Sequence, residues 1–305
     1  MTCFADRLAA AVRQQQTPVL VGLDPRYESL PAPLQSSEGG NDSMHRAQAY
    51  LAFCRGVIDV VAPLVPAVKP QAAFFEQLGP AGAAALADVI RYARNRGLLV
   101  IVDGKRNDVG STATAYAEGY LGANSAWGCD ALTVNPYMGD DGLRPFVDVA
   151  RANDAGVFVL VKTSNPGGAQ FQDLVADGEP IYRHVARHVA KLAAEEVGEA
   201  GFGTAGAVVG ATYPEQLAEL RGVMPQSWLL IPGYGSQGGT ARDVAAAFRG
   251  DGLGAIVNNS RGIIFAHSLA AYSERFGEAR WQDAVEAATK EMIEELREET
   301  SAGAL

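Results

Sequence analysis

The sequence predicts an α/β fold, a closed (β/α)8 TIM barrel that one domain forms over residues 1–305. About eight short apolar segments occur along the chain, and a segment with helical periodicity follows each of them. Such alternation favours parallel strands joined by right-handed crossovers, and a chain of 305 residues suits one barrel. An open doubly wound sheet is the alternative. It usually has a G-x-G-x-x-G turn after its first strand, whereas the first strand here ends in Asp24-Pro25-Arg26.

The first half of the chain supplies four predicted strands. Short apolar segments at 18–24, 65–70, 98–102 and 131–135 are typical of strands buried on both faces of a parallel sheet. A long loop rich in Pro, Ser and Gly covers about 27–42, and a helix is expected to begin near Ser43, a suitable N-cap residue. Further helices are predicted up to Gly97 and over 111–121.

The second half supplies the remaining strands, at 156–162, 206–210, 228–232 and 253–258. Helices are predicted over 142–152 and 181–197. Thr212 and Glu215 have the spacing of a capping box, as do Thr240 and Asp243, whose helix should end at Gly250. A C-terminal helix with one apolar face is predicted at about 280–298.

Composition limits the class of protein. Hydrophobic residues make up 48% of the chain, enough for a substantial core. The formal net charge of −10 disfavours binding to nucleic acid or to an anionic membrane. Cys3, Cys54 and Cys129 are widely spaced, so neither a disulfide framework nor a thiolate zinc site is expected. No apolar segment approaches membrane-spanning length and the N-terminus does not resemble a signal peptide, so the expected location is the cytoplasm.

A charged cluster follows the most apolar strand. Asp103, Lys105 and Asp108 come directly after residues 98–102, and alternation along the strand places Asp103 and Lys105 on one face. A strand end can be polar simply because it leaves the core. Lys and Asp are rarely buried unless they are paired, however, so this acid–base–acid string is more easily understood as a functional site.

Polar residues also stand at the carboxyl ends of other predicted strands. In a TIM barrel the carboxyl ends of the strands form the active site. The residues expected to converge there are Asp24, Lys69, Asp103, Lys105, Thr163, Gln237 and Arg261. The loops after strands seven and eight are the usual phosphate site of such barrels, and here they carry Gly235, Gly238, Gly239 and then Arg261. Glycine amides and an arginine fork suit an anion, so we expect a phosphate group to bind there.

These residues resemble the orotidine 5′-phosphate decarboxylase family, in its longer-chain branch, over nearly the whole chain. The motifs that carry the resemblance are Asp103 to Asp108 (DGKRND), Asp24, Lys69, 161–166 (VKTSNP), 232–239 (PGYGSQGG) and 259–262 (NSRG). The resemblance implies decarboxylation of orotidine 5′-phosphate to uridine 5′-phosphate, the last step of de novo pyrimidine nucleotide synthesis. It implies neither a metal nor an organic cofactor.

The resemblance also implies roles for single residues. Lys105 would donate a proton to the pyrimidine carbon that loses CO2, with Asp103 against the departing carboxylate and Lys69 joining the charge network to the ribose. Asp24 would bind ribose hydroxyls, Thr163 and Ser164 would face the pyrimidine, and Gln237 and Arg261 would hold the phosphate. Asp108, together with Thr112, would reach across a homodimer interface into the partner's site. The family pattern has a smaller amide residue where this chain has Gln71, so the role of Gln71 stays open.

Two other functions are compatible with parts of the pattern. A metal-dependent sugar-phosphate decarboxylase or aldolase on the same barrel would use the carboxylates to hold Mg²⁺. A non-catalytic nucleotide-phosphate binding protein would need Gln237 and Arg261 but not Lys105. His184 and His188 stand at i, i+4 on a predicted helix, but no acidic residue of the motif loops completes a metal site, and we expect both on a helix surface.

Overall fold

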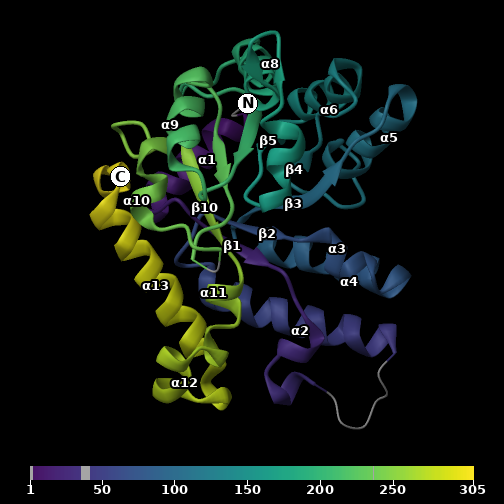
Figure 1. The fold of residues 1–305 in the computed structure, drawn as a ribbon. Helices are drawn as coiled ribbons and strands as arrows, with labels where there is room; N and C mark the ends of the chain where they lie inside the picture. The colour runs from purple at the N-terminus through teal and green to yellow at the C-terminus, as the bar shows by residue number, and fades with distance from the viewer. Residues whose placement is uncertain (1–2, 36–41, 236) are drawn as a thin grey trace.

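Eight strands close into a parallel barrel in the computed structural model, which describes residues 3–35, 42–235 and 237–305 (Figure 1). Around the barrel the strands are β1 (Val19–Leu23), β10 (Ala255–Asn259), β9 (Leu229–Ile231), β8 (Ala205–Val209), β5 (Gly156–Lys162), β4 (Ala131–Val134), β3 (Leu99–Arg106) and β2 (Ala67–Pro70). The pairing of β1 with β10, in which Val19 lies opposite Val257, closes the sheet. The predicted TIM barrel is therefore confirmed, and the open sheet is excluded.

Helices surround the barrel. The longer ones are α2 (Ser43–Val61), α4 (Gly79–Asn95), α5 (Gly110–Leu121), α6 (Asp140–Ala152), α8 (Ile181–Ala194), α9 (Pro214–Val223) and α13 (Trp281–Glu299). Shorter ones are α3 (Ala72–Glu76), α10 (Ala241–Val244), α11 (Arg261–Ile264) and α12 (Ala270–Phe276). Alternation along each strand divides the core in two: Val19 and Val21 pack outward against helices, whereas Leu20 points into the barrel.

An N-terminal helix that the sequence analysis did not predict, α1 (Phe4–Gln15), covers the amino end of the barrel. Its buried Phe4 and Leu8 pack on residues of the barrel interior, and the Phe4 ring meets Phe158 edge-on with centroids 6.1 Å apart. A side chain at Gly156 would collide with the Phe4 ring, so glycine is needed there. Because described side chains fill this end, we expect a site at the carboxyl end of the barrel.

Helix α2 begins at Ser43, as predicted, but two predicted N-caps and one predicted helix end were wrong. Asp42, not Ser43, is the N-cap of α2, and its carboxylate accepts a hydrogen bond from the His45 amide at 2.9 Å. The Thr212 capping box is absent, because the Thr212 hydroxyl donates to the Ser164 carbonyl and Tyr213 occupies the N-cap of α9. The helix expected over 181–197 ends at Ala194.

The Thr240–Asp243 capping box is confirmed, but α10 ends at Val244 and a 3-10 turn over 245–247 replaces the rest of the predicted helix. The long loop predicted at about 27–42 holds 3-10 turns at Tyr27–Ser29 and Ala32–Leu34, and its residues 36–41 lie outside the described residues. The predicted C-terminal helix corresponds to α13.

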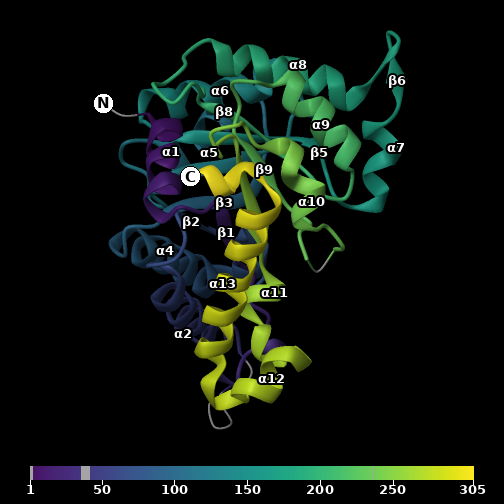
Figure 2. The same cartoon turned by 90° about the vertical axis from the view of Figure 1, so that its left-hand side faces the viewer.

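A small insertion follows β5. It contains α7 (Ala169–Gln172) and a hairpin of β6 (Val175–Ala176) with β7 (Glu179–Pro180). Figure 2 shows this insertion at the end of the barrel opposite α1, which places it beside the open mouth. Within the described part of the chain, no helix has both the length and the apolar character to cross a bilayer.

Candidate active site

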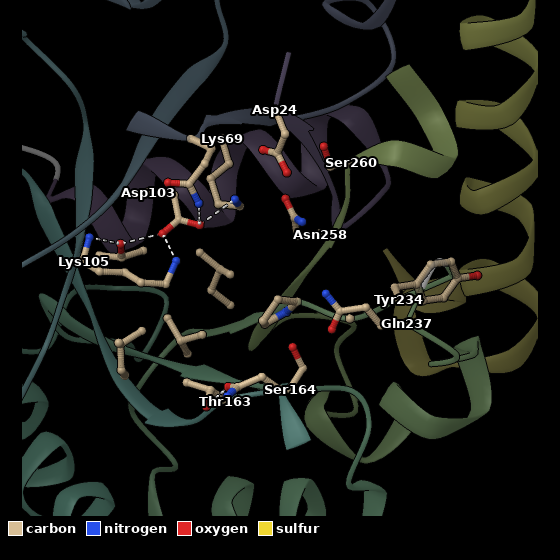
Figure 3. Close-up of a pocket in the computed structure, with 18 of the residues that line it drawn as sticks. Asp24, Lys69, Asp103, Lys105, Thr163, Ser164, Tyr234, Gln237, Asn258 and Ser260 are labelled. Atoms are coloured by element: carbon tan, nitrogen blue, oxygen red, sulfur yellow. Dashed lines mark hydrogen bonds and ion pairs between the residues drawn. The ribbon is translucent and has the colours of Figure 1, made fainter. Parts of the chain in front are cut away.

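A cavity of about 260 Å³ opens at the carboxyl end of the barrel (Figure 3). The strand-end residues expected to converge do line this one cavity: Asp24, Lys69, Asp103, Lys105, Thr163, Gln237 and Arg261. Ser164 lines it too, as do Gln71, Thr133, Asn258 and Ser260, which the sequence analysis did not place there. The parallel arrangement brings these residues together, because it puts the carboxyl end of each strand at the same rim.

Asp103 is the centre of a hydrogen-bonded charge cluster. One carboxylate oxygen, Oδ2, accepts from Lys69 Nζ at 2.9 Å and from Gln71 Nε2 at 3.0 Å. The other, Oδ1, accepts from Lys105 Nζ at 2.6 Å and from the Thr133 hydroxyl at 2.9 Å. Asp103 and Lys69 are buried, only 8% and 4% exposed, so the cluster is held in a region of low dielectric where these interactions are strong.

The cluster fixes the charge of its members. Burial by itself raises the pKa of Asp103, but the ammonium groups of Lys69 and Lys105 outweigh it and hold that pKa well below its usual range. Burial lowers the pKa of Lys69, but Asp103 and Asp24 outweigh it and raise that pKa. Asp103 is therefore an anion and Lys69 a cation at neutral pH.

Thr133 holds Lys105 in an unusual backbone conformation. Lys105 has a φ of +47°, in the left-handed region that long side chains rarely adopt. The amide of Lys105 donates to Thr133 Oγ1 at 2.9 Å, and the same hydroxyl donates to Asp103 Oδ1. Lys105 is thus tied to Asp103 twice, directly through its ammonium and through Thr133 from its backbone. Thr133 was missed, although it is the one polar residue of β4, Ala131–Val134.

The opposite wall of the cavity comes from the loop after β5. The Thr163 amide donates to Gln172 Oε1 at 3.0 Å, and the Thr163 hydroxyl accepts from Gln172 Nε2 at 2.8 Å. The hydroxyl also donates to Asn165 at 2.7 Å, so its hydrogen-bonding capacity is largely used within the loop. Ser164, the next residue, lines the same wall of the cavity.

The loop after β9 separates two hollows. Gly233, Tyr234 and Gln237 line the cavity together with Arg261. Gly235, Gly238 and Gly239, which the sequence analysis expected at the phosphate site, instead line a second hollow on the far side of the loop, near α13. The first two have φ of +67° and +95°, so they serve the path of the loop. The Tyr234 hydroxyl anchors this loop by donating to Glu295 of α13.

Comparison with known proteins adds a family to this geometry. Residues 17–276 match the model of a family described as "Orotidine 5'-phosphate decarboxylase / HUMPS family". The chain belongs to this family. It is 56% identical over 301 residues to the orotidine 5′-phosphate decarboxylase of Rhodopirellula baltica, covering 97% of this chain and all of that protein.

Solved structures of the family agree. The orotidine 5′-monophosphate decarboxylase of Leishmania donovani superposes with a TM-score of 0.76 at 32% identity, and the match covers 100% of both chains. The UMP synthase of Leishmania donovani gives a TM-score of 0.77 at 34% identity. That match covers 98% of this chain but spans only 57% of the synthase.

Two residues that the family resemblance assigns to the site lie elsewhere in this chain. Asp108 stands in the loop after β3, where its carboxylate accepts from the Val109 amide at 2.8 Å, and Thr112 is exposed on α5. Neither lines the cavity of its own chain. They would enter a decarboxylase site only as residues of a partner subunit.

His184 and His188 lie on α8 and are partly exposed, as expected for residues on a helix surface. His184 Nε2 lies 2.8 Å from the Ala176 carbonyl, and His188 Nε2 lies 2.9 Å from Asp140. Within residues 3–35, 42–235 and 237–305, no cluster of three or more His, Cys, Asp or Glu side chains has the arrangement of a metal site.

Proposed function

We propose that the protein decarboxylates orotidine 5′-phosphate to uridine 5′-phosphate and CO2 without a metal or organic cofactor, as the last step of de novo pyrimidine nucleotide synthesis. The observation that carries this proposal is the position of Lys105. Its ammonium is held 2.6 Å from the buried Asp103 carboxylate, and its side chain, 46% exposed, still reaches the cavity. Membership of the decarboxylase family supports the proposal.

Lys105 performs the central chemical role. Loss of CO2 from an sp² ring carbon leaves a carbanion that the ring delocalises poorly. An ammonium placed at that carbon before the reaction stabilises the developing charge, and then gives the carbanion its proton. Asp103 remains ionised because its pKa is lowered by Lys69 and Lys105, and it keeps Lys105 in place as a cation. Asp103 also lies where it can repel the substrate carboxylate, but we assign the larger effect to the fixing of Lys105.

The rest of the substrate supplies binding energy. Arg261 and Gln237 bind the phosphate, Ser164 and Thr163 face the pyrimidine, and Asp24 takes sugar hydroxyls. Asp24 suits that role because its Oδ1 is buried and has no hydrogen-bond partner among the described residues. Decarboxylation needs a barrier reduction of roughly 20 kcal/mol, more than one lysine can supply, so binding at the remote phosphate must help to position the ring.

Asp108 and Thr112 act across a homodimer interface in this proposal. Their position outside the cavity of their own chain supports a role in the partner's site. Mixing Lys105→Ala protein with Asp108→Ala protein tests the idea, because a mixed dimer would contain one site with both residues intact. Recovered activity in the mixture supports sharing, and none refutes it.

The metal-dependent alternative fits this cluster less well. Both oxygens of Asp103 already accept hydrogen bonds from lysine ammonium groups, and two cations beside the carboxylate would repel Mg²⁺. A non-catalytic binding protein has no need for a lysine held by Asp103 and Thr133.

The test is to mix the purified protein with orotidine 5′-phosphate and follow the loss of orotate absorbance, with and without EDTA. Rapid loss that is indifferent to EDTA is the expected result. Loss that EDTA abolishes would indicate the metal-dependent reaction, and no loss at all would refute decarboxylation of this substrate.

A further inference from the structure

Asn258, at the end of β10, is a buried polar residue of the cavity that the proposed function leaves unused. It is only 9% exposed, and it lines the same cavity as Asp24 and Lys69. Its Oδ1 atom is buried without a hydrogen-bond partner in the described part of the chain. Buried polar atoms are nearly always paired, so an unpaired one in a cavity indicates a missing ligand group.

The fold builds a specific corner around this amide. β10 pairs in register with β1, and Gly22 of β1 lies against Asn258 and Ser260. A Cβ atom at Gly22 would lie 2.7 Å from Ser260 Cβ and 3.1 Å from Asn258 Oδ1, so a larger residue there would displace both. Ser260 Oγ donates to the Gly22 carbonyl at 3.1 Å, which fixes the strand end. Asp24, two residues after Gly22, contributes another buried oxygen to this corner, because its Oδ1 also has no hydrogen-bond partner among the described residues (Figure 3).

We infer that Asn258 determines specificity for the sugar, by binding one of two neighbouring ribose hydroxyls beside Asp24 and Lys69; this inference rests on the proposed function. A hydroxyl group both donates and accepts a hydrogen bond. The Asp24 carboxylate only accepts, the Lys69 ammonium only donates, and the Asn258 amide does both. Two adjacent hydroxyls match this set of groups. A deoxy sugar would leave a buried polar group of the enzyme unpaired, and the enzyme would therefore select against it.

The experiment compares kcat/KM for orotidine 5′-phosphate with kcat/KM for its 2′-deoxy and 3′-deoxy analogues. Wild-type enzyme should prefer the ribonucleotide to both. Asn258→Ala should lower kcat/KM for the ribonucleotide roughly tenfold while leaving that for one of the deoxy analogues nearly unchanged, so that discrimination at that hydroxyl falls roughly tenfold.

Asn259→Ala is the matched control. Asn259 is the next residue, is also buried with an unpartnered Oδ1 in the described structure, and does not line the cavity. Its substitution should leave discrimination as in the wild type. If Asn258→Ala lowers kcat/KM equally for all three substrates, the inference is wrong. If that variant does not fold, Asn258→Leu, which is close in volume and cannot form hydrogen bonds, gives the same comparison.

Failure of the proposed function gives a different result. In that case wild-type enzyme would not decarboxylate orotidine 5′-phosphate at all. Calorimetric binding of ribose 5-phosphate and of its 2-deoxy and 3-deoxy analogues then decides the inference by itself. A preference for ribose 5-phosphate over one of these analogues that Asn258→Ala removes supports it, and equal binding of all three sugars by the wild type refutes it.

Discussion

Lys69 on β2 and Lys162 on β5 are both buried lysines at the carboxyl ends of barrel strands, and each pairs with an aspartate. Lys69 pairs with Asp103 at the wall of the cavity. Lys162 pairs with Asp173 of the insertion after β5 and does not line the cavity. The two pairs look alike in the sequence, since both lysines close an apolar strand.

Their surroundings separate them. The Lys162 ammonium lies between two aromatic rings, 5.4 Å from the centroid of Tyr182 and 4.8 Å from that of Tyr213, so its contacts are complete within the fold. Asp103 has a second cation, Lys105, whose side chain is 46% exposed. A buried ion pair therefore occurs both at the cavity and away from it. The site is marked by the additional cation that a ligand can reach.

Removal of that additional cation should have the largest effect. Lys105→Ala should lower kcat by a thousandfold or more, roughly the combined loss of a charge stabiliser and a proton donor, with little change in melting temperature. Lys162→Met removes the same charge from outside the cavity and should keep most of its turnover. The orotate absorbance assay measures both. Near-native turnover in Lys105→Ala would overturn the central assignment.

Phosphate binding offers a second contrast, between two arginines near the loop after β9. Arg261 lines the cavity, whereas Arg242 lies by the second hollow and binds Glu299 through two hydrogen bonds of 2.8 and 3.0 Å. Arg261→Ala should lower kcat/KM by about 100-fold, because binding energy at the phosphate is used to position the reacting ring. Arg242→Ala should leave kcat/KM unchanged. An unchanged kcat/KM in Arg261→Ala would refute the phosphate assignment.

The Lys162–Asp173 pair should contribute to the free energy of unfolding, and the loss should differ according to which partner is removed. Asp173 is 36% exposed, so it can be hydrated when Lys162 is gone, but Lys162 is fully buried and cannot. Asp173→Asn should therefore lower the free energy of unfolding by about 3 kcal/mol and Lys162→Met by about 1 kcal/mol. The double variant Asp173→Leu with Lys162→Met should recover most of the lost stability. Urea denaturation measures all three, and equal losses in the single variants would contradict this view of the pair.

The sequence predicted the barrel because each strand is a short apolar run followed by a helix, a pattern that local physics largely determines. It also predicted the charge cluster, because Asp103 and Lys105 are neighbours on one strand. Helix α1, which covers the amino end of the barrel, was not predicted, even though Phe4, Leu8 and Val12 are spaced four residues apart along it. Its apolar face is short, and nothing local shows that it covers the barrel.

Other residues could not have been predicted, because their roles depend on register between strands far apart in the sequence. Gln71 contacts Asp103 from a different strand end, 32 residues away. Thr133 and Asn258 each lie in a mostly apolar strand, where a small polar residue usually fits the core without any function. Only the closed barrel shows that they face the cavity. The sequence likewise could not show that Gly235, Gly238 and Gly239 face the second hollow, because this depends on the path of the loop after β9.

Thr133 gives a test of how firmly the cluster must be held. Thr133→Val keeps the volume of the side chain but removes the hydroxyl that joins the Lys105 amide to Asp103. It should lower kcat about tenfold with KM unchanged, since the hydroxyl positions Lys105 and need not bind substrate. Thr133→Ser keeps the hydroxyl and should restore most of kcat. A loss in the serine variant as large as in the valine variant would mean that packing, not the hydrogen bonds, is responsible.

The smallest effect concerns pH. The folded-state pKa of Asp103 lies below its usual value of about 4, so the ionised carboxylate stabilises the fold above that pH and this stabilisation is lost as the pH falls toward the folded-state pKa. Asp103→Asn should therefore be less stable than wild type at pH 7, and the difference should shrink below about pH 4, where protonated Asp103 comes to resemble an amide. Urea denaturation at pH 7, 4 and 3 measures the difference. A difference that stays constant over this range would show that Asp103 does not owe its stabilising effect to its charge, and the contrast with the Lys162 pair would then rest on the cavity alone.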